Sequence, residues 1–141
     1  MSTTGYLPDV DDPLTAPFWA AAREHRLVAQ RCVNGHFRWT PSELCPDCLA
    51  PEATWEPLRG EATVWSLAVY HRAMHPAFAG RVPYTVAMLE LPEGIRMLGT
   101  IETSTGDADR DGEVRIGDIV TATFDAVTDD VTLVRWRAGV E

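Results

Sequence analysis

Three cysteines and one histidine are spaced as the ligands of a metal ion. Cys45 and Cys48 form a C-x₂-C pair, and Cys32 lies upstream, separated from that pair by twelve residues. A zinc ribbon is built from two such knuckles, whose thiolates complete a tetrahedral Zn²⁺ site. In the first knuckle Gly35 stands where a second cysteine is expected, and His36 follows it. The four residues therefore predict a structural Cys₃His zinc site. The alternative is a ribbon that keeps its shape without metal, with the thiols as small buried apolar groups.

Charge is unevenly distributed along the chain. Twelve arginines and no lysine stand against 21 acidic residues, which gives a net charge of −9. This balance disfavours nucleic acid as a ligand, because such binding depends on neutralising many phosphates. Residues 18–41 nevertheless carry four arginines and one glutamate. Such a patch either holds an anionic ligand through forked hydrogen bonds or consists of ordinary solvated charges, and the sequence leaves both interpretations open.

Location is inferred from what the chain lacks. No apolar stretch approaches the roughly 20 residues of a membrane-spanning helix. The first residues do not resemble a signal peptide, so we expect a cytoplasmic protein whose thiols stay reduced. A disulfide between Cys45 and Cys48 is therefore not expected.

The elements that must position these residues are mostly strands. A helix is predicted over residues 14–25, with one face formed by Phe18, Ala21, Ala22 and His25. Strands of the ribbon are predicted at 27–31, 37–39 and 54–58. Five further β-runs follow, at 62–71, 84–91, 95–101, 119–126 and 131–136.

The five later runs predict a small closed barrel of the OB type, since no strong helix interrupts them. The predicted fold is therefore mainly β. It comprises an N-terminal arm and helix (1–26), a rubredoxin-like zinc ribbon (27–60) and a five-stranded OB-fold barrel (61–141).

One acidic stretch matches the start of a calcium loop. Asp107, Asp109 and Asp111 alternate before Gly112. Calcium loops of this type are flanked by helices, whereas strands are predicted here, and Arg115 stands at a usual ligand position. We therefore expect a solvated acidic connection.

Several short motifs together resemble a known family. They are Pro17-Phe-Trp19, Leu27-Val-Ala-Gln-Arg-Cys32, Cys45-Pro-Asp-Cys48, His75-Pro-Ala-Phe78, Val82-Pro-Tyr84 and Val127-Thr-Asp-Asp-Val-Thr-Leu133. With the predicted helix, ribbon and barrel, they make nearly the whole chain similar to the zinc-ribbon/OB-fold family of acyl-CoA-associated proteins, formerly a domain of unknown function. The chain departs from this family at Gly35, where members usually have a cysteine.

The resemblance implies an accessory subunit beside a thiolase-like or lipid-transfer-protein-like enzyme. Carbon–carbon chemistry would lie mainly on the partner, as an aldolase or a thiolase-type acyltransferase, and this chain would help enclose the CoA thioester. Retro-aldol cleavage of a steroid or other acyl-CoA side chain is favoured over thiolysis. A hetero-oligomer with two copies of each chain is consistent with this role, and no catalytic residue is assigned to this chain.

CoA combines phosphates with a long apolar arm, so a binder needs arginine and an apolar slot. The residues predicted to bind CoA or face the partner are Arg23, Arg26, Arg38, Trp39, His71, His75 and Phe78. In the alternative interpretation, His75 starts a turn and Phe78 plugs the open end of the barrel.

Two other classes of function compete with this one. Exposed aromatic residues on an OB barrel can stack bases, which makes a single-stranded nucleic-acid-binding module the alternative function. The net charge and the absence of lysine argue against it. A stand-alone hydrolase finds no support, because we identify no set of nucleophile, base and orienting group.

Overall fold

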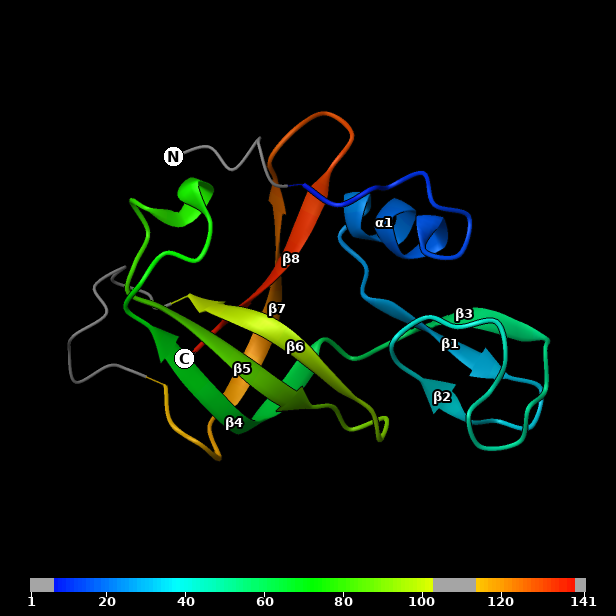
Figure 1. Cartoon of the computed structure of the whole chain (residues 1–141). Coiled ribbons are helices and arrows are strands. Elements are labelled where there is room, and N and C mark those ends of the chain that lie inside the picture. Colours follow the sequence, from blue (N-terminus) through cyan, green and yellow to red (C-terminus); the bar gives the residue numbers. More distant parts are fainter. Residues whose placement is uncertain (1–6, 103–113, 139–141) are drawn as a thin grey trace.

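The structure, a computed structural model, describes residues 7–102 and 114–138. Along the chain the elements are α1 (Ala16–Arg23), β1 (Val28–Cys32), β2 (Phe37–Arg38), β3 (Ala53–Pro57), β4 (Glu61–Tyr70), the 3₁₀-helix η1 (Pro76–Phe78), β5 (Tyr84–Glu90), β6 (Arg96–Glu102), β7 (Ile119–Ala126) and β8 (Thr132–Arg137) (Figure 1). The predicted mainly β fold is confirmed. The predicted calcium-like aspartates at 107, 109 and 111 lie outside the described residues.

Helix α1 is shorter than the predicted helix. Pro17 occupies its first turn, where a missing N–H costs no hydrogen bond, and its apolar face, including Phe18, is buried. His25 lies beyond the end of the helix, at a φ of 62°, and is exposed. Its ring instead stacks on Phe124 of β7, with the ring centroids 5.2 Å apart. Placing His25 on the helical face was therefore wrong, because the helix ends at Arg23, two residues earlier than predicted.

The ribbon is a three-stranded antiparallel sheet in the order β2-β1-β3. In the central strand, Gln30 lies opposite Arg38 of β2 on one side and Trp55 of β3 on the other. Cys32 ends the central strand opposite Ala53 of β3, and the ligand atoms of His36, Cys45 and Cys48 lie close to its sulfur.

The remaining strands close into a five-stranded barrel in the order β4-β5-β6-β8-β7. The pairing is antiparallel except between β6 and β8, where Ile101 lies opposite Trp136. Pairing of β4 with β7 closes the barrel, and Val64 and Leu89 are almost fully buried in its core. This arrangement confirms the predicted OB-type barrel.

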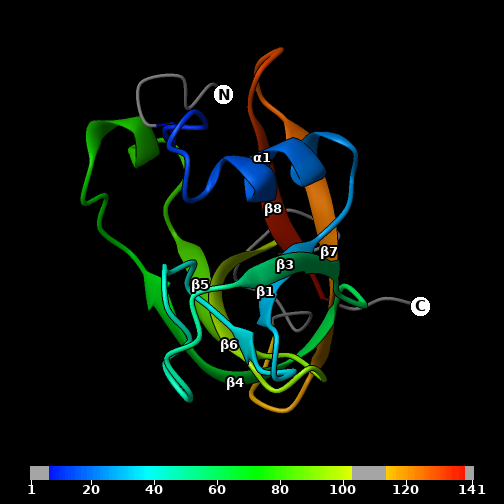
Figure 2. The ribbon, with the colours of Figure 1, turned by 90° about the vertical axis from the view of Figure 1, so that its right-hand side faces the viewer.

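Ribbon, helix and barrel share one apolar core. Leu27 of the ribbon belongs to the same buried cluster as Leu89 and Trp136 of the barrel. The backbone N–H of Leu58 also donates to the carbonyl of Leu27 at 2.8 Å, which anchors the segment that leads into the barrel. In Figure 2 the ribbon and α1 face the viewer, with the barrel strands behind them. The shared core fixes the ribbon against the barrel, so residues from both can line one site.

No helix within the described ranges is both long and apolar enough to cross a bilayer.

Candidate functional site

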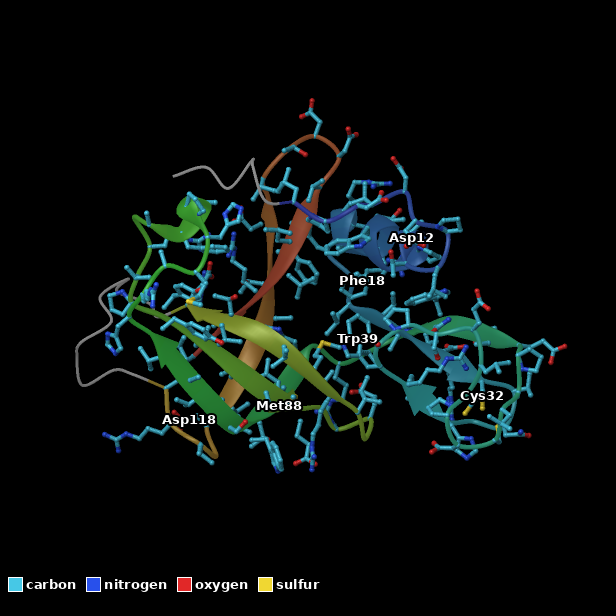
Figure 3. The ribbon with its side chains drawn as sticks, viewed as in Figure 1. Asp12, Phe18, Cys32, Trp39, Met88 and Asp118 are labelled. Atoms are coloured by element: carbon cyan, nitrogen blue, oxygen red, sulfur yellow. The ribbon has the colours of Figure 1, made fainter. Side chains whose placement is uncertain are left out.

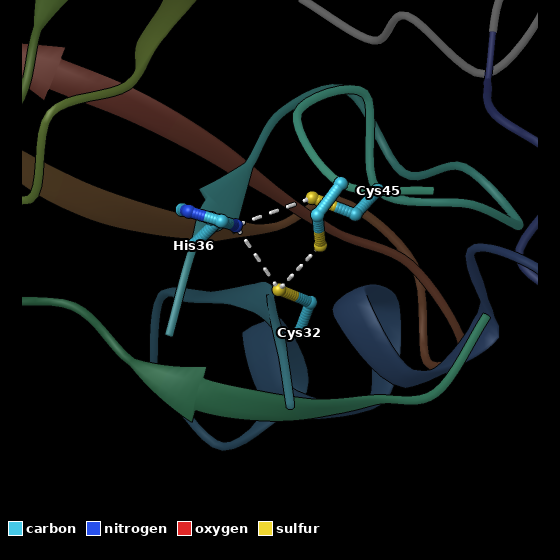
Figure 4. Close-up of side chains that lie close together, drawn as sticks. Cys32, His36 and Cys45 are labelled. Carbon is cyan, nitrogen blue, oxygen red and sulfur yellow. Dashed lines mark hydrogen bonds between the residues drawn. The ribbon is translucent and has the colours of Figure 1, made fainter. Parts of the chain in front are cut away.

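The four predicted metal ligands lie together at the end of the ribbon. Their ligand atoms all lie within 4.8 Å of one another. The Cys32 Sγ lies 3.4 Å from the His36 Nδ1 and 3.7 Å from the Cys48 Sγ, and the Cys45 Sγ lies 3.7 Å from the His36 Nδ1. Figure 4 shows Cys32, His36 and Cys45 pointing toward a common centre.

These distances fit a tetrahedral zinc ion. A Zn–S bond of about 2.3 Å implies S···S edges of about 3.8 Å in a regular tetrahedron, and the shorter Zn–N bond implies slightly shorter S···N edges. The three edges given above agree with this geometry. The donor set of three thiolates and one imidazole is a known structural zinc set. The residues present therefore fit a structural zinc ion held by Cys32, His36, Cys45 and Cys48.

The first knuckle explains how His36 reaches the site in place of a cysteine. Gly35 has a φ of 91°, a conformation that favours glycine, and its N–H donates to the Cys32 carbonyl at 2.9 Å. The Cys32 N–H in turn donates to the His36 carbonyl at 2.9 Å. This tight turn brings the imidazole, one residue after the expected cysteine position, to the fourth corner of the cluster.

Each of the three cysteine sulfurs accepts a hydrogen bond from a nearby N–H group. Backbone N–H groups donate to two of the sulfurs, from Asn34 to Cys32 at 3.3 Å and from Asp47 to Cys45 at 3.4 Å. The Asn34 side-chain amide donates to the Cys48 Sγ at 3.3 Å and lowers the pKa of Cys48 to about 7. Burial raises the pKa of Cys45. The cluster thus contains one readily ionised, half-buried thiol and one fully buried thiol.

A second site is a groove between α1, the ribbon and the barrel, which we call the aromatic groove. It has a volume of about 400 Å³. Its lining residues are Thr15, Phe18, Trp19, Trp39, Pro41, Phe78, Arg81, Met97, Leu98, Thr100, Leu133, Val134, Arg135 and Trp136. Figure 3 shows Phe18 and Trp39 between α1, the ribbon and the barrel, well away from Cys32. The volume lies in the range of small-molecule sites, and the lining is mostly apolar.

Close aromatic packing shapes the walls of the groove. The Phe18 ring meets the Trp19 ring edge to face at a centroid distance of 4.9 Å and lies 5.0 Å from the Trp39 ring. Trp39 and Phe78, which were predicted separately from the ribbon and from a barrel loop, therefore share one site.

The predicted arginine patch does not form as a unit. Arg23 is exposed and donates to the Asp130 carbonyl at 3.2 Å, and Arg26 pairs with Glu24 at 2.7 Å. Arg38 is only 4% exposed, and it donates to the Gln30 Oε1 at 3.1 Å and to the Ser42 carbonyl at 2.8 Å. Arg38 therefore does not join the other two at the surface, because it holds together the interior of the ribbon.

The predicted histidines differ in their surroundings. His71 is exposed beyond the end of β4, whereas His75 is half-buried. The His75 Nδ1 accepts the Ala77 N–H at 3.0 Å and so caps the short helix η1, which the sequence did not predict. The Phe78 ring lies 5.4 Å from the Tyr84 ring at the start of β5. The cap on η1 agrees with the interpretation that His75 starts a turn. That Phe78 plugs the open end of the barrel and that this loop binds CoA both stay predictions.

Sequence reasoning missed Arg81, Arg135 and Trp136 as groove residues. Arg135 and Trp136 lie in a strand that was predicted correctly, but alternation alone does not say which residues reach a neighbouring element. Arg81 follows η1 in an irregular segment and carries no local pattern. An arginine between two aromatic residues, Phe78 and Tyr84, was the one available signal.

Two family models match the chain in sequence order. Residues 19–53 match the rubredoxin-like zinc ribbon domain of ChsH2, and residues 55–125 match its C-terminal OB-fold domain. Among solved structures, the "Ltp2-ChsH2(DUF35) aldolase" has a chain 29% identical to this one, with a TM-score of 0.78. The match covers 94% of this chain and 100% of that chain.

Three curated proteins are similar in sequence. A "Probable enoyl-CoA hydratase alpha subunit" of Thermomonospora curvata is 40% identical over 57% of this chain and 25% of its own length. The "3-oxo-4,17-pregnadiene-20-carboxyl-CoA hydratase alpha subunit" of Mycobacterium tuberculosis is 36% identical over 78% of this chain and 33% of its own length. A "DUF35 domain-containing scaffold protein" of Methanocaldococcus jannaschii is 31% identical over 84% of this chain and 82% of its own length. The chain thus spans a quarter to a third of the first two relatives and most of the third.

Proposed function

Because the chain belongs to the ChsH2/DUF35 family of zinc-ribbon and OB-fold proteins, we propose that it is the accessory subunit of an acyl-CoA enzyme whose partner chain is thiolase-like. One observation carries this proposal. The chain matches the full length of a chain in the Ltp2-ChsH2 aldolase at a TM-score of 0.78 and 29% identity. A match over the whole ribbon and barrel supports a subunit of the same kind rather than a shared fragment.

The reaction of the complex is the finer part of the proposal. We favour retro-aldol cleavage of a steroid or other acyl-CoA side chain over thiolysis, since the matched structure is named an aldolase. The names of the two hydratase subunits support an acyl-CoA substrate, although those proteins are three to four times longer than the matched region. In this proposal the partner performs the carbon–carbon chemistry and this chain helps enclose the thioester.

In this proposal the Cys₃His cluster has a structural role, and the aromatic groove contacts the ligand. A zinc ion in the Cys₃His cluster would hold the two ribbon loops together and so keep Trp39 in place beside Phe18. The aromatic groove would then offer an apolar wall to the arm or acyl part of the thioester. Of the residues predicted for CoA or partner contact, Trp39 and Phe78 line this wall, while Arg23, Arg26 and His71 remain exposed for contact with a partner.

The first experiment is a pull-down of the tagged chain from its native lysate, with mass spectrometry of proteins that elute in stoichiometric amount. We expect a thiolase-fold chain, and the purified complex should cleave an acyl-CoA that the partner alone cleaves more slowly. A chain that elutes alone, or with nucleic acid in place of a protein, would contradict the proposal.

A further inference from the structure

The aromatic groove combines a mostly apolar lining with two arginines. Three of the five tryptophans line it: Trp19 from α1, Trp39 after β2 and Trp136 from β8. Two arginines, Arg81 and Arg135, also line it, and none of its described lining residues is acidic. A groove of this composition matches a ligand with an apolar body and a negatively charged group.

The two arginines are not equivalent. Arg135 is already neutralised, because its Nε lies 3.0 Å from the Asp125 Oδ2 and 3.7 Å from the Glu102 Oε2. Arg81 makes no ion pair with any described residue. Its guanidinium instead lies over the Phe78 ring, 5.6 Å from the centroid. Arg81 is therefore the groove cation that is available to an anion.

The surroundings of Arg81 make an anion favourable there. The residue is half-buried, and burial lowers its pKa, with a further contribution from the neighbouring Arg135. Asp125 and Glu102 act on Arg81 in the opposite direction, but both contact Arg135 rather than the groove. A partly desolvated guanidinium gains most from a carboxylate, which accepts two parallel N–H bonds.

We propose that the aromatic groove binds a free amphipathic carboxylate, with the carboxylate at Arg81 and the apolar body against Trp19, Trp39 and Trp136. The volume of about 400 Å³ suits a medium-chain acid or a molecule of similar size. The inference goes beyond the proposed function, since binding of such an acid needs neither the partner chain nor CoA. The isolated chain is sufficient for the test.

The tryptophans provide a position-specific readout. In a titration of the zinc-loaded, ¹⁵N-labelled chain with decanoate, we expect the indole N–H signals of Trp19, Trp39 and Trp136 to shift together and to saturate. Signals of Trp55 in β3 and Trp65 in β4 should not move, because neither residue lines the groove. Two ligands of the same chain length, 1-decanol and decyltrimethylammonium, should bind at least about tenfold more weakly, since they lack the charge-assisted hydrogen bonds.

Variants test the role assigned to Arg81. Arg81→Gln should weaken decanoate binding about tenfold or more while leaving 1-decanol binding unchanged, and Arg81→Lys should retain part of the preference for the acid. Arg59→Gln is the matched control, because Arg59 is exposed, pairs with Glu61 at 3.5 Å and lies outside the groove.

The proposal is overturned if decanoate does not bind below its solubility limit, or if wild-type protein binds decanoate and 1-decanol equally. Shifts confined to Trp65 would also overturn it. All three results would leave the partner pull-down unaffected, so failure here is distinguishable from failure of the proposed function.

Discussion

At the scale of single residues, the metal cluster contains two thiols with opposite tendencies. Cys48 is half-buried and accepts a hydrogen bond from the Asn34 side-chain amide, which stabilises its thiolate. Cys45 has no exposed surface, and burial disfavours its charged form. A hydrogen bond therefore favours the charged form of Cys48, whereas burial disfavours that of Cys45.

In metal-free protein, Cys48 should therefore be alkylated by iodoacetamide before Cys45. The pKa of Cys48 is lowered to about 7, so its reactivity should rise as pH increases through about 7 and level off above it. Peptide mass spectrometry at a series of pH values measures both rates. Asn34→Ala should move the Cys48 midpoint upward, toward the ordinary thiol value. Equal rates for the two cysteines would contradict this assignment.

The depressed pKa of Cys48 also sets a direction for stability. A thiol whose folded pKa lies below its unfolded value stabilises the folded state above the unfolded pKa, and this contribution is lost as pH falls toward the folded value. In the metal-free chain the Cys48 contribution should therefore decline between pH 9 and pH 7. Urea unfolding of metal-free wild type and Asn34→Ala at both pH values measures it. The variant should show a smaller decline.

At the scale of elements, we expect the stability of the ribbon to depend on its metal cluster. We expect the stability of the barrel to depend on the close approach of Gly99 in β6 to Trp136 in β8. β2 has only two residues, so its hydrogen bonds alone hold the first knuckle weakly. Zinc binding by four residues from both knuckles would supply the missing constraint.

Chelation of zinc should lower the melting temperature of wild type by roughly 10 °C, as expected when a ligand present at about 100 to 1,000 times its Kd is removed. Cys45→Ser should purify with little zinc, measured by elemental analysis, and melt near the chelated wild type. The chelator should then have no further effect on the variant. An equal drop in both proteins would show that stabilising metal lies elsewhere and would favour the metal-free ribbon.

The barrel prediction concerns Gly99 in β6. A Cβ at this position would overlap the Trp136 Cδ1 and lie 2.7 Å from its Nε1, and Trp136 is only 1% exposed. Gly99→Ala should therefore lower the free energy of unfolding by about 1–3 kcal/mol, measured by urea denaturation. Gly80→Ala is the control, since nothing lies within 4 Å of a Cβ there. Similar stability of the two variants would show that Trp136 has room to move.

At the scale of the whole molecule, the shared core turns two small units into one site. Leu27 of the ribbon and Leu89 of the barrel lie in one buried cluster, and the aromatic groove opens along the junction. Neither the ribbon nor the barrel alone contains Trp39 and Trp136. The site therefore exists only when both units are folded against each other.

The overall charge makes a further prediction at this scale. With a net charge of −9 and no lysine, the chain should show no saturable binding to a labelled single-stranded oligonucleotide, measured by fluorescence anisotropy at low salt. Low salt gives electrostatic binding its best chance, so a negative result there is decisive. Binding that weakens steeply with added salt would instead favour the nucleic-acid-binding OB module.

The sequence by itself determined the local features of this protein. The spacing of Cys32, Cys45 and Cys48 predicted the ribbon and its cluster, because a knuckle is formed by a few neighbouring residues. Alternating apolar residues predicted the strands, since each strand repeats its pattern every second residue. The short helix η1 was not predicted, because it is capped by a hydrogen bond from the Ala77 N–H to the His75 Nδ1 and has no periodic sequence pattern.

The tertiary structure decided which distant residues meet. It buried Arg38 against Gln30, left Arg81 without an acidic neighbour in the groove, and brought Phe18 and Trp39 beside β8. Periodicity states which face of an element is apolar, but not which other element covers that face. The aromatic groove depends on the packing of α1, ribbon and barrel, so only the folded chain could reveal it.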